Sequence, residues 1–202
     1  MMKHGLIVSL SGPSGVGKGT ILSKVREDHP DSKSSVSVTT RSPREGEEEG
    51  VAYFFRTKEQ FRQMLSDGEI IEYDEYVGNF YGTPAGPLKE MSSSGSDVLL
   101  DLTIAGSLAL KEKFEEAVTI FILPPSYEEL ESRLKGRGTE TEDVIARRLA
   151  EAKSEILRAN EFDYVVVNDD VDKAAAKIEA IIEAERCRYE RNKGIEKNSS
   201  WT

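Results

Sequence analysis

The chain has 202 residues, of which 38% are hydrophobic and 32% are charged, and this composition predicts one globular domain without a membrane span. Its formal net charge of −10 argues against a nucleic-acid-binding surface, because such a surface needs a basic face that neutralises phosphates. The single cysteine, Cys187, excludes an intramolecular disulfide and a thiolate metal cluster, and we expect a soluble, cytoplasmic protein.

The first predicted elements are a strand over residues 6–10, a glycine-rich turn and a helix over residues 18–28. Glycines allow the N–H groups of such a turn to converge on an anion, and Lys18 adds a full positive charge. We therefore predict that a nucleotide polyphosphate binds here and that Lys18 takes part in catalysis. The strict phosphate-loop pattern has Ser or Thr directly after the lysine, where this chain has Gly19, and Thr20 follows as a candidate magnesium ligand. The predicted loop consists of Gly12, Pro13, Ser14, Gly15, Val16, Gly17, Lys18, Gly19 and Thr20.

Residues 34–84 interrupt the alternation of apolar runs and helical patterns, and they predict an inserted mixed α/β subdomain. We expect short strands at 53–55 and 70–73, a helix over 58–66 between them, and a turn at 78–82. This subdomain is expected to face the substrate.

Two arginines of the subdomain, Arg41 and Arg44, lie three residues apart around a proline that prevents an ordinary helix interior. Two such guanidiniums can converge on one phosphate through charge-assisted hydrogen bonds, with Tyr53 and Tyr81 as further hydroxyl donors. The alternative is that both arginines only neutralise the acidic run at 45–49. Beside a phosphate loop, a second phosphate site predicts a phosphorylated acceptor.

The subdomain also carries candidate base-reading residues, Glu72 at the end of an apolar strand and Thr83 after the predicted turn. A carboxylate accepts two adjacent N–H donors and a hydroxyl donates to a carbonyl, and together they match the N1–H, N2–H and O6 edge of guanine. Adenine presents the opposite polarity to the carboxylate. The alternative for Glu72 is a surface acid at a strand end.

Four apolar runs, at 6–10, 98–102, 118–123 and 164–167, predict a parallel sheet that is buried on both faces, and a fifth run at 36–39 is a candidate to join it. The predicted fold class is α/β: a three-layer phosphate-loop core with a parallel sheet, an inserted mixed subdomain for the monophosphate and a helical lid. Helical patterns beyond the first helix and the inserted subdomain occupy residues 84–94, 104–114, 126–135, 142–159 and 170–190.

Ligands of such folds lie beyond the carboxyl ends of the strands, where Asp101 ends the second of these apolar runs. Its carboxylate is a candidate to orient magnesium-bound waters or the acceptor. A plain helix cap is the alternative.

Residues 135–140 carry two glycines beside basic residues between two helical patterns, which is typical of a mobile lid. Arginines near this segment can stabilise the charge that develops on a transferred phosphoryl group while the closed lid excludes water. We favour Arg137 and Arg148 over the other two arginines, although each of the four can instead be an exposed arginine paired with a glutamate. The four arginines are Arg133, Arg137, Arg147 and Arg148.

Together these residues resemble the guanylate kinase family along nearly the whole chain. The stretch T-T-R-S-P-R-E-G-E at 39–47 and the stretch Y-G-T-P at 81–84 are far more specific than the phosphate loop. The resemblance implies a guanylate-kinase-like domain over residues 1–190 and a disordered tail over 191–202. Within the domain it implies a GMP-binding part at 34–84, a lid at 126–156, and a core made of residues 1–33, 85–125 and 157–190.

The resemblance also implies the reaction, a direct in-line transfer of the γ-phosphoryl group of ATP to GMP, and to dGMP, with magnesium required. Residues 12–20 and Arg133 would bind ATP, with Lys18 on the β- and γ-phosphates, and Asp101 would act on the metal through water. No nucleic acid or membrane partner is implied, and both a monomer and a homo-oligomer remain open. The implied GMP-binding residues are Ser37, Arg41, Arg44, Tyr53 and Tyr81 for the phosphate side, Glu72 and Thr83 for the base, and Asp101 and Thr103 beside them.

One stretch departs from the family pattern. Residues 101–106 read D-L-T-I-A-G where the family commonly reads D-I-D-x-Q-G, so the second acid is Thr103 and the glutamine is Ala105. We therefore expect weaker GMP discrimination or affinity than in a relative with both acids. Two alternatives stay open at this point, a non-catalytic phosphopeptide-binding module of the same fold and a kinase for another phosphorylated acceptor.

Overall fold

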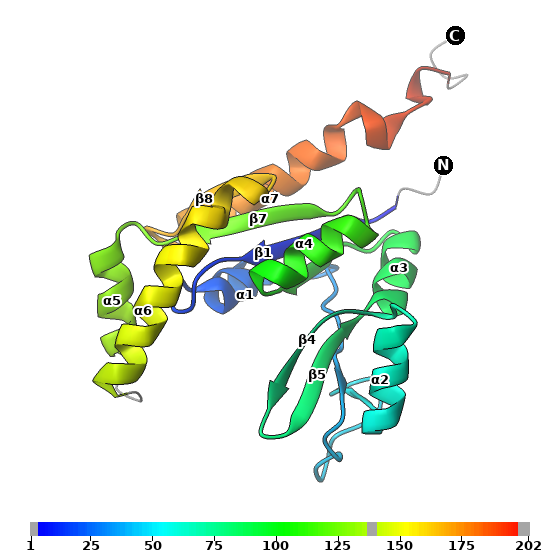
Figure 1. Ribbon diagram of the computed structural model, residues 1–202. Helices are drawn as coiled ribbons and strands as arrows, with labels where there is room; N and C mark the ends of the chain where they lie inside the picture. The colour runs from blue at the N-terminus through cyan, green and yellow to red at the C-terminus, as the bar shows by residue number, and fades with distance from the viewer. Residues whose placement is uncertain (1–3, 137–140, 198–202) are drawn as a thin grey trace.

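The computed structural model describes residues 4–136 and 141–197, and its centre is a parallel sheet of four strands (Figure 1). The strands are β1 (Ile7–Ser11), β6 (Val98–Asp101), β7 (Val118–Leu123) and β8 (Tyr164–Val167), in the order β6-β1-β7-β8. Each of them coincides with one of the four apolar runs, so the predicted parallel sheet is confirmed. In the register of β1 with its neighbours, Leu10 lies opposite Asp101 on one side and Ile120 on the other, which brings the carboxyl ends of the strands to one edge.

Helices cover both faces of this sheet and complete the three predicted layers. One hydrophobic cluster joins the sheet to α1 (Lys18–Asp28) and α7 (Val171–Cys187), and a second joins the other face to α3 (Ala85–Ser93) and α4 (Ile104–Lys113). Because β1, β6 and β7 are buried on both faces, their sequences are mainly apolar runs, whereas the edge strand β8 leaves Val165 and Val167 exposed. The core therefore holds the strand ends, and the groups that follow them, in a rigid frame.

The inserted subdomain contains the second sheet, in the order β3-β2-β5-β4, with β2 parallel to β3 and antiparallel to β5. The helix predicted over 58–66 is α2 (Lys58–Ser66), which begins at a capping box formed by Thr57 and Gln60 and buries Phe61. The bounds of the strands are β2 (Val38–Thr39), β3 (Phe54–Phe55), β4 (Ile70–Tyr76) and β5 (Asn79–Pro84).

Two details of the subdomain differ from the sequence-based expectation. The run at 36–39 is not a fifth strand of the central sheet, because the chain makes only an isolated bridge between Lys33 and Val98 before it leaves that sheet and forms β2 in the other. The predicted turn at 78–82 is shorter than expected. Val77 and Gly78 alone make the turn, and the residues that follow already form β5 and pair with β4.

The segment predicted to be a lid contains two helices, α5 (Tyr127–Gly136) and α6 (Glu142–Ile156), which lie on one side of the core while the β4–β5 hairpin and α2 extend from another (Figure 1). A small cluster of buried residues, including Leu130 and Leu149, holds the pair together. The helix predicted to continue to residue 159 ends as an α-helix at Ile156 and continues as a 3-10 segment, Leu157–Glu161.

The segment after α7, which was expected to be disordered from residue 191, contains two short 3-10 helices, Tyr189–Asn192 and Ile195–Lys197. Arg191 contacts the core, since its guanidinium donates to the carbonyl of Glu116 at 2.6 Å and to the buried carboxylate of Glu185 at 3.3 Å. Residues 198–202 lie outside the described part of the chain. None of the described helices combines the length and the apolar character that a membrane crossing requires.

Candidate functional site

The phosphate loop joins the end of β1 to the start of α1, and two of its glycines are required by close contacts. Gly12 has a φ of 141°, and a Cβ there would collide with the carbonyl oxygen of Ile122, while Gly17 has a φ of 96° and would bring a Cβ within 2.7 Å of Asn168 Nδ2. Gly17 caps α1 without a side-chain hydrogen bond, so the first N–H groups of this helix are available to an anion. Lys18 Nζ donates to the carbonyl of Gly12 at 2.9 Å, which holds the ammonium over the loop.

Asn168 is a positioning residue of this loop that the sequence interpretation missed. It follows β8 directly, is 2% exposed, and donates from Nδ2 to the carbonyl of Val16 at 2.7 Å. Arg133, from α5, stabilises the same part of the loop, since it donates to the carbonyls of Val16 at 3.4 Å and Asn168 at 3.1 Å. The rule that singled out Asp101, a polar side chain at the end of a predicted parallel strand, also applies to Asn168.

One carboxylate lies beside the lysine of the loop, and the charge of the lysine acts on a second one. Asp101 Oδ1 lies 3.8 Å from Lys18 Nζ, and burial raises the pKa of Asp101, while Lys18 and Arg26 act in the opposite direction. Glu155, near the end of α6, is a second residue that was not predicted. Burial raises its pKa, and the opposing effect of Lys18 on that pKa means that the two charges lie within electrostatic reach. The two acids therefore surround the Lys18 ammonium with negative charge, and bound phosphates can take over this role.

The predicted base-reading acid, Glu72, contacts the start of α4 across the boundary between subdomain and core. Its Oε2 accepts a hydrogen bond from Thr103 Oγ1 at 2.6 Å and a second one from the Thr103 backbone N–H at 3.2 Å. Thr103 is at the same time the N-cap of α4 and accepts from the N–H of Gly106 at 3.0 Å. Burial is the main cause that raises the pKa of Glu72, and the two hydrogen bonds from Thr103 lower it.

Gly106 leaves the space that the Glu72 carboxylate occupies. A Cβ at this position would overlap the carboxylate group and come within 2.9 Å of Glu72 Cγ. Thr83 is the other predicted base-reading residue, and it is buried at 7% exposure on β5 of the subdomain.

The predicted phosphate-binding arginine Arg41 is held in a compact cluster. Its guanidinium forms a two-pronged ion pair with Glu47, at 2.8 and 2.9 Å, and lies 5.4 Å from the ring centroid of Tyr53. The hydrogen bonds from Arg41 lower the pKa of Glu47 to about 2, and the same bonds raise the pKa of Arg41. The Tyr53 ring contacts the Tyr81 ring edge-on, with 5.9 Å between centroids. Arg41 is thus paired with the acidic run and pre-organised beside both tyrosines.

The other two predicted residues of this cluster are less constrained. Arg44 is exposed, its backbone N–H donates to Glu47 Oε2 at 2.8 Å, and its guanidinium forms no ion pair with another described residue. Ser37 is half-buried, and its carbonyl accepts from the N–H of Phe54 at 2.9 Å, which places it at the start of β2.

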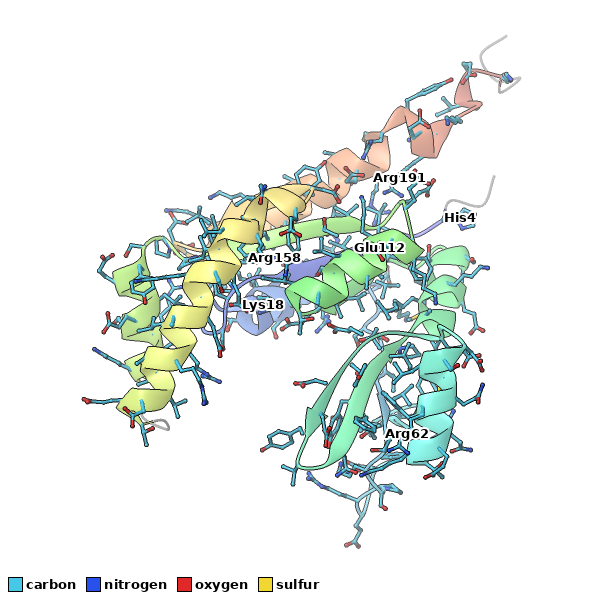
Figure 2. All side chains as sticks on the ribbon, viewed as in Figure 1. His4, Lys18, Arg62, Glu112, Arg158 and Arg191 are labelled. Carbon is cyan, nitrogen blue, oxygen red and sulfur yellow. The ribbon has the colours of Figure 1, made fainter. Side chains whose placement is uncertain are left out.

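The predicted site residues therefore form three groups, Lys18 with Asp101, Glu72 with Thr103, and Arg41 with the two tyrosines. The first two groups are joined, because Asp101 and Thr103 stand two residues apart at the end of β6 and Asp101 contributes to the raised pKa of Glu72. The lid arginines are placed only in part. Arg148 is half-buried on α6, Arg147 is exposed, and Arg137 lies outside the described residues. Figure 2 shows Lys18 at α1 in the core and the subdomain residue Arg62 beside α2.

Comparisons with known proteins agree with one another. The guanylate kinase family model matches residues 4–185. A guanylate kinase from Halalkalibacterium halodurans is 50% identical over 189 residues, which cover 94% of this chain and 93% of that protein. A guanylate kinase from Lactococcus lactis subsp. lactis is 48% identical over 191 residues, which cover 95% of this chain and 93% of that protein.

Solved structures give the same result. The crystal structure of guanylate kinase from Anaplasma phagocytophilum has a TM-score of 0.66 and 39% identity, and the match covers 92% of this chain and 88% of that chain. The SH3-kinase fragment of tight junction protein 3 matches with a TM-score of 0.50 at 12% identity and covers 58% of that chain, which shows a similarity of fold alone.

Proposed function

The chain belongs to the guanylate kinase family, whose activity is the ATP-dependent phosphorylation of GMP, and we propose how its own residues carry out this reaction. The single observation that supports the assignment of residues is the joint at the end of β6. There Asp101 faces the phosphate-loop lysine and, two residues later, Thr103 holds the base-reading acid Glu72. A donor site and an acceptor site thus meet at one strand end, as phosphoryl transfer between two nucleotides requires.

On the donor side, the N–H groups of residues 12–20 would bind the ATP phosphates, and Lys18 would exchange its contacts with Gly12 and Asp101 for the β- and γ-phosphates. Arg133 would act mainly by supporting the loop from the lid side. Arg148, and Arg137 with it, would approach the transferred group from the lid and stabilise the charge on its equatorial oxygens.

The residues present fit a magnesium ion, since Mg²⁺ is usually held by one or two protein oxygens together with substrate phosphates and water. Thr20 has an exposed hydroxyl in the first turn of α1, and the Asp101 carboxylate lies at the same edge of the sheet. We propose that Thr20 and, through water, Asp101 hold the ion. When bound, it would neutralise charge on the β- and γ-phosphates.

On the acceptor side, Arg41, Arg44, Tyr53 and Tyr81 would bind the GMP phosphate, with Ser37 beside them. Glu72 and Thr83 would read the guanine. Because these contacts involve the phosphate and the base, we propose dGMP as a second acceptor.

We propose the same division of the domain as the sequence predicts. It consists of a GMP-binding part (34–84), a lid (126–156) and a core made of residues 1–33, 85–125 and 157–190. The cytoplasmic location is also a prediction.

The test is an acceptor panel with the purified protein, ATP and magnesium, in which GMP, dGMP, AMP, UMP and dTMP are compared by the formation of ADP and of the nucleoside diphosphate. GMP-dependent ADP formation is expected, and its absence would refute the assignment. Lys18→Ala should lower kcat by about 100-fold or more, because a pre-organised charge on the transferred phosphates is lost. Lys24→Ala, on the same helix but paired with Glu27 and Asp28 at the surface, is the matched control and should keep full activity.

A further inference from the structure

We propose that this chain also phosphorylates 6-oxopurine monophosphates that lack the 2-amino group, with inosine 5′-monophosphate (IMP) as the representative acceptor. The inference rests on the proposed role of Glu72 as the base-reading acid. It concerns one question, namely how many N–H donors of the base the Glu72 carboxylate can accept in this chain.

The carboxylate of Glu72 is half occupied by its own protein. A carboxylate oxygen offers two lone-pair sites, and Oε2 fills both with the hydroxyl of Thr103 at 2.6 Å and the N–H of Thr103 at 3.2 Å. Turning the Thr103 hydroxyl away from Glu72 would cost free energy, because this hydroxyl also accepts the Gly106 N–H as the N-cap of α4. Within the described residues, no hydrogen bond reaches Oε1, so this oxygen alone is available to a base.

The N1–H and N2–H bonds of guanine are parallel, so a single oxygen can lie in line with only one of them. Guanine presents N1–H and N2–H side by side, and a carboxylate with both oxygens free accepts one donor on each. With Oε2 occupied, Oε1 accepts N1–H, and the 2-amino group gains no carboxylate partner from Glu72. Hypoxanthine has the same N1–H and the same O6 as guanine and differs only by a hydrogen in place of that amino group.

Among the described residues, the two acids whose charges act on Glu72 have other roles or partners. Asp101 is the proposed holder, through water, of the magnesium ion, and Asp74 is exposed and accepts the backbone N–H of Glu75 at 2.8 Å. Residue 103, where the family commonly has a second acid, supplies a hydroxyl that is already engaged with Glu72. The site therefore selects for N1–H and O6 and against adenine, whose N1 is an acceptor, but it has little means to select for the 2-amino group.

The size of the effect follows from the value of one hydrogen bond to a charged group, which is roughly ten- to hundredfold in a binding constant. A site that reads both N–H donors should prefer GMP to IMP by that factor. For this chain we expect a ratio of kcat/KM for GMP to kcat/KM for IMP below about tenfold, and a ratio of GMP to AMP above about 100-fold. Because GMP and IMP share ribose and phosphate, the first ratio reports on the 2-amino group alone.

The experiment measures kcat/KM for GMP, IMP and AMP, at saturating MgATP, in the wild type and in three variants. Thr103→Asp offers a second carboxylate to the 2-amino group and keeps a good N-cap, so the ratio of GMP to IMP should rise about tenfold or more. Thr103→Ser keeps the hydroxyl and should keep the wild-type ratio. Thr57→Asp makes the same replacement at the N-cap of α2, outside the base site, and should also leave the ratio unchanged.

The outcomes separate this inference from the proposed function. Rapid GMP turnover with a ratio of GMP to IMP above about tenfold in the wild type would overturn the inference and leave the guanylate kinase assignment intact. A low ratio that Thr103→Asp does not raise, in a variant whose melting temperature and ATP KM are normal, would also overturn it. Absence of turnover with GMP itself would instead contradict the proposed function.

Discussion

Gly106 has a role that a single added methyl group can test. The residue lies in the first turn of α4 with a φ that any residue adopts, yet a Cβ at this position would overlap the Glu72 carboxylate and approach Glu72 Cγ to 2.9 Å. In Gly106→Ala the flexible Glu72 side chain must therefore leave its position beside Thr103. We expect the variant to fold normally and to lose recognition of the base.

The magnitude follows from two opposite effects. Alanine is better than glycine in a helix by about 1 kcal/mol, which compensates for the hydrogen bonds lost between Glu72 and Thr103, so the free energy of unfolding should stay within about 1 kcal/mol of the wild type. Loss of a charged hydrogen bond to the base costs about 1.5–3 kcal/mol, so kcat/KM for GMP should fall by roughly 10- to 150-fold. The KM for ATP should not change.

The assay combines initial rates at varied GMP and at varied ATP with thermal unfolding of the same samples. Gly86→Ala is the matched control, since Gly86 also lies in the first turn of a helix, α3, and a Cβ there would meet nothing within 4 Å. An unchanged kcat/KM for GMP in a stable Gly106→Ala protein, or an equal loss in Gly86→Ala, would refute the reasoning.

Three further predictions concern other contacts of the site. Asn168→Ala removes a buried hydrogen bond to the phosphate loop, so chemical denaturation should show that the free energy of unfolding falls by about 1–3 kcal/mol. The KM for ATP should rise while the KM for GMP does not, and equal changes in both would contradict this. Hydrogen bonds from the Arg41 guanidinium and from the Arg44 backbone N–H lower the pKa of Glu47 from 4.5 to about 2, so the stability from these contacts is present above pH 4.5 and lost as the pH falls toward 2. In Glu47→Gln the melting temperature should therefore fall less between pH 4.5 and pH 2 than in the wild type. An equal fall in both proteins would argue against this contribution of Glu47. Burial raises the pKa of Glu72, and the hydrogen bonds from Thr103 lower it. Thr103→Val removes the hydroxyl donor, so the acid limb of the pH profile of kcat/KM for GMP should move to higher pH. An unmoved limb would count against this role of Thr103.

Features with a local cause could be predicted from the sequence. The helices at 18–28 and 58–66 were predicted with the bounds that the structure has. A glycine turn marks the start of the first in the sequence, and the structure shows a capping box at the start of the second. The four central strands followed from their length and apolar character alone. The run at 36–39, which alternates apolar and polar residues, pairs in another sheet, since pairing depends on where the chain travels after Lys33.

Features that depend on distant residues could not be predicted. Glu72 and Thr103 are 31 residues apart in sequence, and only the docking of β4 against α4 shows that one supplies the donors for the other. The same holds for Asn168 and the carbonyl of Val16, which are 152 residues apart. For Arg41 the two sequence interpretations were not exclusive, because the pairing with Glu47 is what orients the guanidinium beside Tyr53.

The contact between Glu72 and Thr103 also has a mechanical consequence. It joins the inserted subdomain to the core at the end of β6, whereas the Arg41 cluster is carried by the second sheet, in which β2 pairs with β5 and β5 with β4. If this contact holds while the subdomain rotates against the core, it acts as the pivot and Arg41 moves with the subdomain. We therefore expect the base of the acceptor to stay in place as a pivot, while its phosphate swings toward the loop that holds the donor.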